Sequence, residues 1–117
     1  MKKNIKGVGT DIADIQRFSN LKKGFAEKVF TERERDYCLS QKNPAQHFAA
    51  RFAGKEAVIK ALGKSEGDIG MNEIEIVNDS RGKPLVSLPD RLSKHTLLLS
   101  LSHSRTTAVA FAVALGD

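Results

Sequence analysis

The sequence predicts a single α+β domain in which helices pack on one face of an antiparallel sheet. Three observations support this prediction. Helical patterns fill most of the first half of the chain, short alternating strands fill the second half, and a length of 117 residues suits one ordinary domain. We therefore expect residues 1–117 to form one domain, small enough to gain stability from oligomerisation.

The chain is expected to begin with a strand. Residues 5–12 alternate and include β-branched side chains, and the strand pattern ends near Asp11. Asp11 then either contributes to a site at the strand end or caps a helix over residues 13–20. A helical pattern that is interrupted at Gly24 covers residues 14–30.

Two further helices are better marked. Thr31 and Glu34 have the spacing of a capping box, in which each side chain accepts a hydrogen bond from a free amide at the start of a helix. The longest helix runs from about residue 45 to residue 62 and ends at Gly63.

The second half of the chain is expected to form two hairpins. Residues 73–77 and 84–88 alternate on either side of turn-forming residues. Residues 97–102 and 107–115 form the second pair and are the most apolar strands, so we expect them to be central. A loop over residues 64–70 joins the long helix to the first hairpin.

The helix over residues 45–62 is predicted to be buried on two sides. At one residue every ~100°, one side collects four large apolar residues: Phe48, Phe52, Ile59 and Leu62. The other side is formed by small residues, which allow a second backbone to approach closely: Ala50, Ala53, Gly54, Ala57 and Ala61.

Two ionisable residues of this helix, Lys55 and Glu56, fall inside its large apolar arc. A buried charge without a partner costs on the order of several kcal/mol. These residues therefore form an ion pair with each other, line a wet cleft or meet a ligand. We favour the cleft, because Arg51 and Lys60 on adjacent turns complete a mixture of cations and carboxylate suited to phosphates and a metal ion.

Composition restricts the partners and the compartment. The formal charge of +5 and the pI near 9.5 indicate an anionic partner, which is nucleic acid, an acidic protein or a phosphorylated small molecule. The single Cys38 cannot form an internal disulfide and is expected to be a buried apolar side chain. We find no apolar run of transmembrane length and no signal-peptide pattern, so we expect a cytoplasmic protein without a membrane partner.

Four groups of residues, in this order and spacing, resemble the holo-acyl-carrier-protein synthases, which are bacterial-type 4'-phosphopantetheinyl transferases. They are Gly9-Thr10-Asp11-Ile12, Arg51-Phe52-Ala53-Gly54-Lys55-Glu56-Ala57 with Lys60, Asn78-Asp79 with Gly82-Lys83-Pro84, and Ser100-Leu101-Ser102-His103-Ser104. The resemblance covers essentially the whole chain. One departure is the loop over residues 64–70, which in the family usually reads closer to Gly-Thr-Gly-Ile-Gly.

The resemblance implies a reaction in which the phosphopantetheine arm of coenzyme A moves to a serine of apo-acyl carrier protein and leaves adenosine 3',5'-bisphosphate. Asp11 and Glu56 would hold Mg²⁺ on the coenzyme A pyrophosphate. Glu56 or a metal-bound water would remove the serine proton. Lys60, one helical turn beyond Glu56, would reach the same phosphates, and His103 would touch the pyrophosphate or the leaving group.

The resemblance also implies a binding site for the rest of coenzyme A. Arg51 and Lys55 would contact the 3'-phosphate or a neighbouring subunit. The adenine would be bordered by Gly82, Lys83 and Pro84, and the site would further include Ser102, Lys60 and His103.

The family further implies two kinds of protein contact, a homotrimer with sites at subunit interfaces and a complex with acidic acyl carrier protein. For the carrier protein we expect a basic surface with apolar anchors, formed by Arg17, Phe18, Lys22, Lys23 and Phe25. The alternative is a small basic nucleic-acid-binding module. Against this alternative, the chain has no Trp, only 6% aromatic residues and no aromatic-basic strand of the kind that stacks bases, so we expect no nucleic-acid partner.

Overall fold

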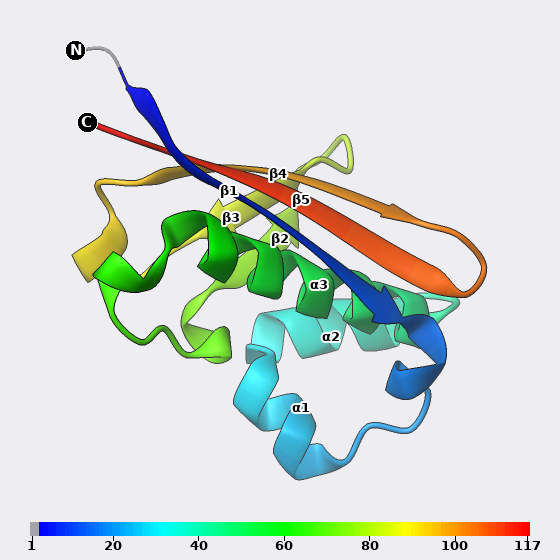
Figure 1. Cartoon of the computed structure of the whole chain (residues 1–117). Helices are drawn as coiled ribbons and strands as arrows, with labels where there is room; N and C mark the ends of the chain where they lie inside the picture. Colours follow the sequence, from blue (N-terminus) through cyan, green and yellow to red (C-terminus); the bar gives the residue numbers. More distant parts are fainter. Residues whose placement is uncertain (1–2) are drawn as a thin grey trace.

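The computed structural model describes residues 3–117. A three-stranded antiparallel sheet forms one layer, and three helices lie on one face of it (Figure 1). The strands of this sheet are β1 (Asn4–Asp14), β5 (Thr107–Gly116) and β4 (Thr96–His103), in that spatial order. The helices are α1 (Lys23–Val29), α2 (Glu32–Ser40) and α3 (Pro44–Leu62). The predicted α+β class is confirmed.

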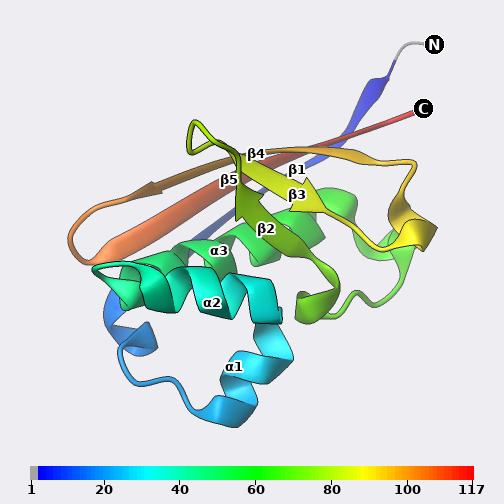
Figure 2. The same cartoon turned by 180° about the vertical axis from the view of Figure 1, so that it is seen from behind.

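A separate two-stranded sheet packs beside α3, as the reverse view shows (Figure 2). It consists of β2 (Glu75–Asn78) and β3 (Pro84–Ser87), the first predicted hairpin. In the larger sheet, β5 is central as expected, but β4 lies at an edge. The prediction that both apolar C-terminal strands are central was therefore wrong for β4, because the long β1 pairs with the other side of β5.

Small residues bring the sheet and α3 into close contact. A Cβ atom on Gly7 would lie 2.1 Å from the carbonyl oxygen of Ala61, and one on Gly9 would lie 2.0 Å from that of Ala57. On β5, the residues that face the helix are buried alanines, Ala108, Ala110, Ala112 and Ala114. The predicted close approach of another backbone to the small side of α3 is confirmed.

The N-terminal region differs from the prediction. β1 continues past Asp11 to Asp14, whose carboxylate accepts a hydrogen bond from the amide of Gln16 and caps a short 3₁₀ helix. Asp11 is therefore a strand residue, and the helix-cap alternative is wrong. The break in the helical pattern falls before Lys23, and Gly24 lies inside α1.

The outer face of the large sheet carries several exposed apolar side chains. Because strand residues alternate between faces, the residues opposite α3 point away from the core. Those that are 38% to 70% exposed are Ile5, Val8, Ile12, Leu98, Val109 and Phe111. We call this group the outer sheet face. Exposed apolar surface of this kind is typical of interaction sites.

No helix within residues 3–117 has both the length and the apolar composition needed to cross a membrane. Shorter 3₁₀ turns complete the chain at Ile15–Phe18, Lys64–Glu66, Met71–Glu73 and Asp90–Leu92.

Candidate functional site

The predicted site residues project from opposite sides of α3. At about 100° per residue, Glu56 lies roughly 140° around the helix from Arg51, and Lys60 lies roughly 180° from Arg51. Lys60 faces β1, where its ammonium contacts Asp11. Arg51 faces the small sheet, where it contacts Asn78 at the end of β2. We call these the carboxylate side and the cationic side of α3.

On the carboxylate side, Lys60 is positioned by β1. Its Nζ donates to the carbonyl oxygen of Thr10 at 2.9 Å and to Oδ1 of Asp11 at 3.2 Å. The absence of a side chain at Gly9 allows this approach, because a Cβ atom there would be 2.9 Å from the Cβ of Lys60. The fold therefore brings Asp11 and Lys60 together, and the Asp11 side chain retains 20% exposure.

Two carboxylates lie on this side, one on β1 and one on α3. Asp11 lies on the face of β1 that packs on α3, and Glu56 is a half-buried residue of the facing helix. Within residues 3–117, no group of three or more His, Cys, Asp or Glu side chains gathers as a metal site. Any metal here would thus have two protein carboxylates at most, which is the protein contribution that Mg²⁺ usually requires when a phosphate substrate supplies further oxygens.

A cleft of about 760 Å³ opens beside Lys60. It is bordered by the end of α3 and the loop over residues 64–70, including Gly63, Lys64, Gly67 and Asp68. Arg91 holds this loop by donating to the Asp68 carbonyl at 3.3 Å and to the Glu73 carboxylate at 2.5 and 2.9 Å. Lys64 adds a second cation that sequence reasoning did not assign to the site.

On the cationic side, Arg51 lies at a smaller cavity of about 240 Å³. The cavity is lined by residues from α3, the small sheet and β4, which include Arg51, Asn78, Gly82, Pro84, Ser102 and His103. Five residues predicted to bind coenzyme A therefore meet at one cavity. Lys83 is part of the adjoining turn through its backbone, since its amide donates to Asp79 Oδ1 at 2.9 Å, and its side chain is exposed.

His103 is held at the rim of this cavity by α3. Its Nε2 accepts a hydrogen bond from the side-chain amide of Gln46 at 2.9 Å, which leaves Nδ1 to donate to the Ser104 carbonyl at 3.3 Å. Gln46 also lines the cavity. The sequence motif around His103 did not reveal this contact, because Gln46 is 57 residues away in the chain.

A second histidine, His47, lines the same cavity and was missed by sequence reasoning. Its ring meets the Tyr37 ring edge-on, with the centroids 5.6 Å apart. Burial lowers the pKa of His47 below 6.5, and the charges of Arg51 and His103 lower it further. His47 is therefore neutral near pH 7 and can act there as a hydrogen-bonding group without adding charge.

Lys55 is not a ligand-binding residue in this fold, and that prediction was wrong. Its side chain is completely buried, and its Nζ contacts Glu34 Oε1 at 2.5 Å and the carbonyl oxygens of Val29 and Met71 at 2.8 and 3.0 Å. All three ammonium protons are thus used inside the protein. The favoured wet cleft and the alternative ion pair with Glu56 are both replaced, for Lys55, by a buried ion pair with Glu34. Glu34 also forms the predicted capping box with Thr31.

Cys38 is a buried apolar side chain, as expected. Burial raises the pKa of its thiol to about 12, so the reactive thiolate form is scarce at neutral pH.

The expected carrier-protein surface is only partly exposed. Phe18 is buried, with 3% of its surface exposed, so its assignment as a docking contact was wrong. It packs on Phe52 with the ring centroids 5.3 Å apart and supports Phe25, which is 37% exposed. Arg17 lies across the Phe18 and Phe52 rings at 5.7 and 5.9 Å. Phe52 is one helical turn from Glu56, which makes this surface continuous with the carboxylate side.

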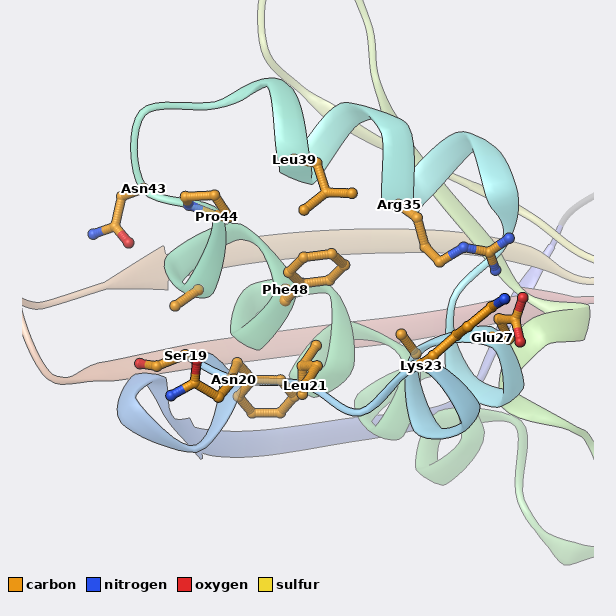
Figure 3. A pocket seen from close by; sticks show the side chains of 13 residues that line it. Ser19, Asn20, Leu21, Lys23, Glu27, Arg35, Leu39, Asn43, Pro44 and Phe48 are labelled. Carbon is orange, nitrogen blue, oxygen red and sulfur yellow. The ribbon is translucent and has the colours of Figure 1, made fainter.

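Two clefts flank this surface. A cleft of about 240 Å³ is lined by Arg17, Lys22 and Phe25, among others. The other, of about 710 Å³, lies between α2 and the segment that precedes α1, with Phe48, Leu39 and Leu21 in its centre and Lys23, Glu27 and Arg35 at one end (Figure 3). Lys22 and Lys23 therefore border different clefts.

Residues 7–114 match the profile of the 4'-phosphopantetheinyl transferase superfamily. The chain belongs to this superfamily, and its relatives there are holo-[acyl-carrier-protein] synthases. The protein of that name from Protochlamydia amoebophila is 48% identical over 117 residues, which cover 92% of this chain and 95% of the relative. The chain is accordingly a transferase enzyme.

Solved structures agree with this assignment. A holo-(acyl-carrier-protein) synthase from Bacillus anthracis, in complex with CoA (3',5'-ADP), has a TM-score of 0.83 and 34% identity, with 99% of this chain and 100% of that chain covered. The synthase from Neisseria meningitidis has a TM-score of 0.82 and 33% identity, with 95% and 98% covered. These comparisons favour the transferase over the nucleic-acid-binding alternative.

Proposed function

We propose that this enzyme transfers the 4'-phosphopantetheine group of coenzyme A to a serine of apo-acyl carrier protein in a Mg²⁺-dependent reaction. The observation that carries the proposal is the arrangement around α3. One side pairs the carboxylate of Asp11 with Lys60, and the other side opens a cavity at Arg51 and His103. Such groups suit phosphoryl transfer, in which a protein mainly positions the reactants and neutralises charge.

In the proposed reaction, the serine oxygen bonds to the phosphorus that carries the pantetheine arm. The bond from that phosphorus to the bridging oxygen breaks, and adenosine 3',5'-bisphosphate leaves with the electron pair. Glu56 takes the serine proton, and Lys60 contacts the phosphate oxygens. His103 stabilises the leaving group. Mg²⁺, held by Asp11 and Glu56, would supply positive charge to the pyrophosphate oxygens.

The cationic side would bind the nucleotide portion of coenzyme A. Arg51 is assigned to the 3'-phosphate, because guanidinium groups bind phosphates through paired hydrogen bonds. The turn containing Gly82 and Pro84 would border the adenine, and Ser102 would supply a hydroxyl beside His103.

A complete site would require a second copy of the chain. Arg51 and Lys60 point roughly 180° apart around α3, so the buried body of the helix lies between them. Two adjacent subunits can place the carboxylate side of one beside the cationic side of the other. The outer sheet face offers apolar surface for association, and the resemblance to the family favours three copies. Light scattering should report a trimer at micromolar concentration, and a monomer under active conditions would contradict the shared site.

Acyl carrier protein would dock on the exposed cations Arg17, Lys22 and Lys23 and on Phe25. Carrier proteins are acidic, so complementary charge would guide the encounter and set the register. The cytoplasmic location expected from the sequence stays a prediction.

The transfer can be tested with purified components. The enzyme is incubated with apo-acyl carrier protein, coenzyme A and Mg²⁺, and the carrier is analysed by mass spectrometry. We expect a mass gain of one phosphopantetheine group, no gain in a carrier that lacks the serine, and loss of the reaction when a chelator removes Mg²⁺. An unmodified carrier under all conditions would contradict the proposed function, and a reaction that survives chelation would contradict its metal dependence.

A further inference from the structure

The guanidinium of Arg51 is buried, and its direct contacts are with the neutral side chains of Tyr37 and Asn78. Glu34 lines a neighbouring cavity with Arg51 but forms its salt bridge with Lys55. Arg51 is only 2% exposed. Its Cζ lies 4.4 Å from the centroid of the Tyr37 ring, and its Nη2 donates to Asn78 Oδ1 across 3.4 Å. Its Nε has no hydrogen-bond partner within the part of the chain that the structure describes. Among residues 3–117, no carboxylate forms a salt bridge with Arg51.

The buried Lys55 provides a comparison for the missing counter-charge of Arg51. Lys55, one turn further along α3, is also buried, but Glu34 balances its charge at 2.5 Å. A buried charge without a counter-charge is costly. Arg51 carries this cost at the wall of a cavity, where an anion can supply the missing counter-charge.

Asn78 and Tyr37 form a connected support for Arg51. The side-chain amide nitrogen of Asn78 donates to the Tyr37 hydroxyl at 3.1 Å. This hydrogen bond turns the Asn78 carbonyl oxygen toward the guanidinium. Asn78 is also fixed by its backbone, because it pairs with Pro84 at the end of β2. Ring and amide together restrict the guanidinium without neutralising it.

We propose that Tyr37 and Asn78 are positioning residues that keep the charge of Arg51 available for a phosphomonoester in the cavity. The inference rests on the proposed function, in which that group is the 3'-phosphate of coenzyme A. The neutrality of both supports is the essential feature. A carboxylate in place of the Asn78 amide would pair with Arg51 in the free enzyme, and the phosphate would then have to compete with it.

The substitution Asn78→Asp tests this idea because it changes charge with little change of shape. Steady-state transfer is measured with coenzyme A and with 3'-dephospho-coenzyme A. We expect the KM for coenzyme A to rise about tenfold or more, as for loss of a charge-assisted contact, with kcat nearly unchanged. The kinetics with 3'-dephospho-coenzyme A should change little, so the preference between the two substrates should fall.

Two further variants separate positioning from folding. Asn4→Asp adds the same charge at an exposed position near the start of β1 and should leave the preference unchanged. Tyr37→Phe retains the ring beneath Arg51 but removes the hydrogen bond to Asn78, and it should reduce the preference by a smaller factor of a few-fold.

Direct binding supplies a second measurement. Calorimetry with adenosine 3',5'-bisphosphate and with adenosine 5'-monophosphate should show that Asn78→Asp weakens the first ligand selectively. An equal loss of affinity for both substrates and both ligands in Asn78→Asp, or no loss of affinity, would overturn the positioning role. The proposed function would still stand in that case if the unmodified enzyme transfers normally. Absence of transfer by the unmodified enzyme would overturn both.

Discussion

On the side of α3 that faces β1, Lys60 is paired with a carboxylate and remains largely exposed. On the side that faces β2, Arg51 is buried, and its partners among the described residues are neutral. The first arrangement places both signs of charge at a cleft, which suits a metal ion and the phosphates that it binds. The second places one sign of charge at a small cavity, which suits a single anionic group.

This difference indicates that α3 separates two tasks. The carboxylate side contains the groups proposed to act on the reacting phosphorus. The cationic side contains groups proposed to bind the nucleotide. Lys55, buried between the two sides, serves the fold. Substitutions in the Lys55 ion pair, on the carboxylate side and on the cationic side should therefore differ in their effects on stability, kcat and KM.

The largest expected effect is on stability. Glu34→Ala would leave Lys55 buried without its counter-charge and would also remove the hydrogen bond to the Ile76 amide. We expect a loss of about 3–5 kcal/mol in the free energy of unfolding, as for other broken buried ion pairs. Urea denaturation measures this change. The double variant Glu34→Leu with Lys55→Met should recover much of the loss, and a destabilisation of Glu34→Ala within experimental error would contradict a structural role for the pair.

On the carboxylate side, Asp11→Ala and Glu56→Ala should each lower kcat/KM for transfer by at least about 100-fold, the scale of losing one electrostatic contact to the transition state. Thermal unfolding should change little, because neither side chain belongs to the buried core. Substantial Mg²⁺-dependent activity in either folded variant would contradict the assignment of that residue as a metal ligand.

The basic surface next to the carboxylate side should affect association alone. Arg17→Glu is expected to raise the KM for carrier protein about tenfold, with the effect shrinking as salt is added, because screening weakens charge steering. The KM for coenzyme A should be nearly unchanged. A matched increase in both constants would indicate that Arg17 belongs to the nucleotide site.

The smallest expected effect is a pH dependence on the cationic side. Burial and neighbouring cations lower the pKa of His47 below 6.5 in the folded protein. As pH falls through 6.5, the unfolded chain takes up this proton before the folded one does, so stability falls until the folded-state pKa is passed. His47→Gln should reduce this acid-side loss in denaturation curves recorded across that range. Identical pH profiles for the two proteins would contradict the lowered pKa.

Local patterns predicted much of the fold. The capping box at Thr31, the end of α3 at Gly63 and the close packing on its small side all follow from neighbouring residues, and each is present. The N-terminal boundary was wrong because alternation alone does not show how far a strand continues when a partner strand pairs with it. Here β5 pairs with β1 as far as Asp14.

The site was harder to predict because its contacts cross the chain. Helical periodicity showed that Lys55 points inward, but it did not show that Glu34 lies opposite, since the two residues belong to different helices. In the same way, Gln46, His47 and Tyr37 gave no local signal of their places near the cavity. The resemblance to the family indicated Asp11, Lys60 and Arg51. Helical periodicity already places Lys60 and Arg51 on opposite sides of the helix, but only the fold shows that Lys60 meets Asp11 of β1 and that Arg51 meets Asn78 of β2.

Mixing two inactive variants tests most directly whether the two sides of α3 complete one site between subunits. Asp11→Ala removes a functional group from the carboxylate side, and Arg51→Met removes one from the cationic side. Each variant alone should be nearly inactive at low coenzyme A concentration. Refolded together in equal amounts, they should regain about one quarter of the wild-type sites, the fraction expected for random assembly around a closed ring of identical interfaces. Activity of the mixture equal to the mean of the two separate variants would contradict a shared site and would place both half-sites within one chain.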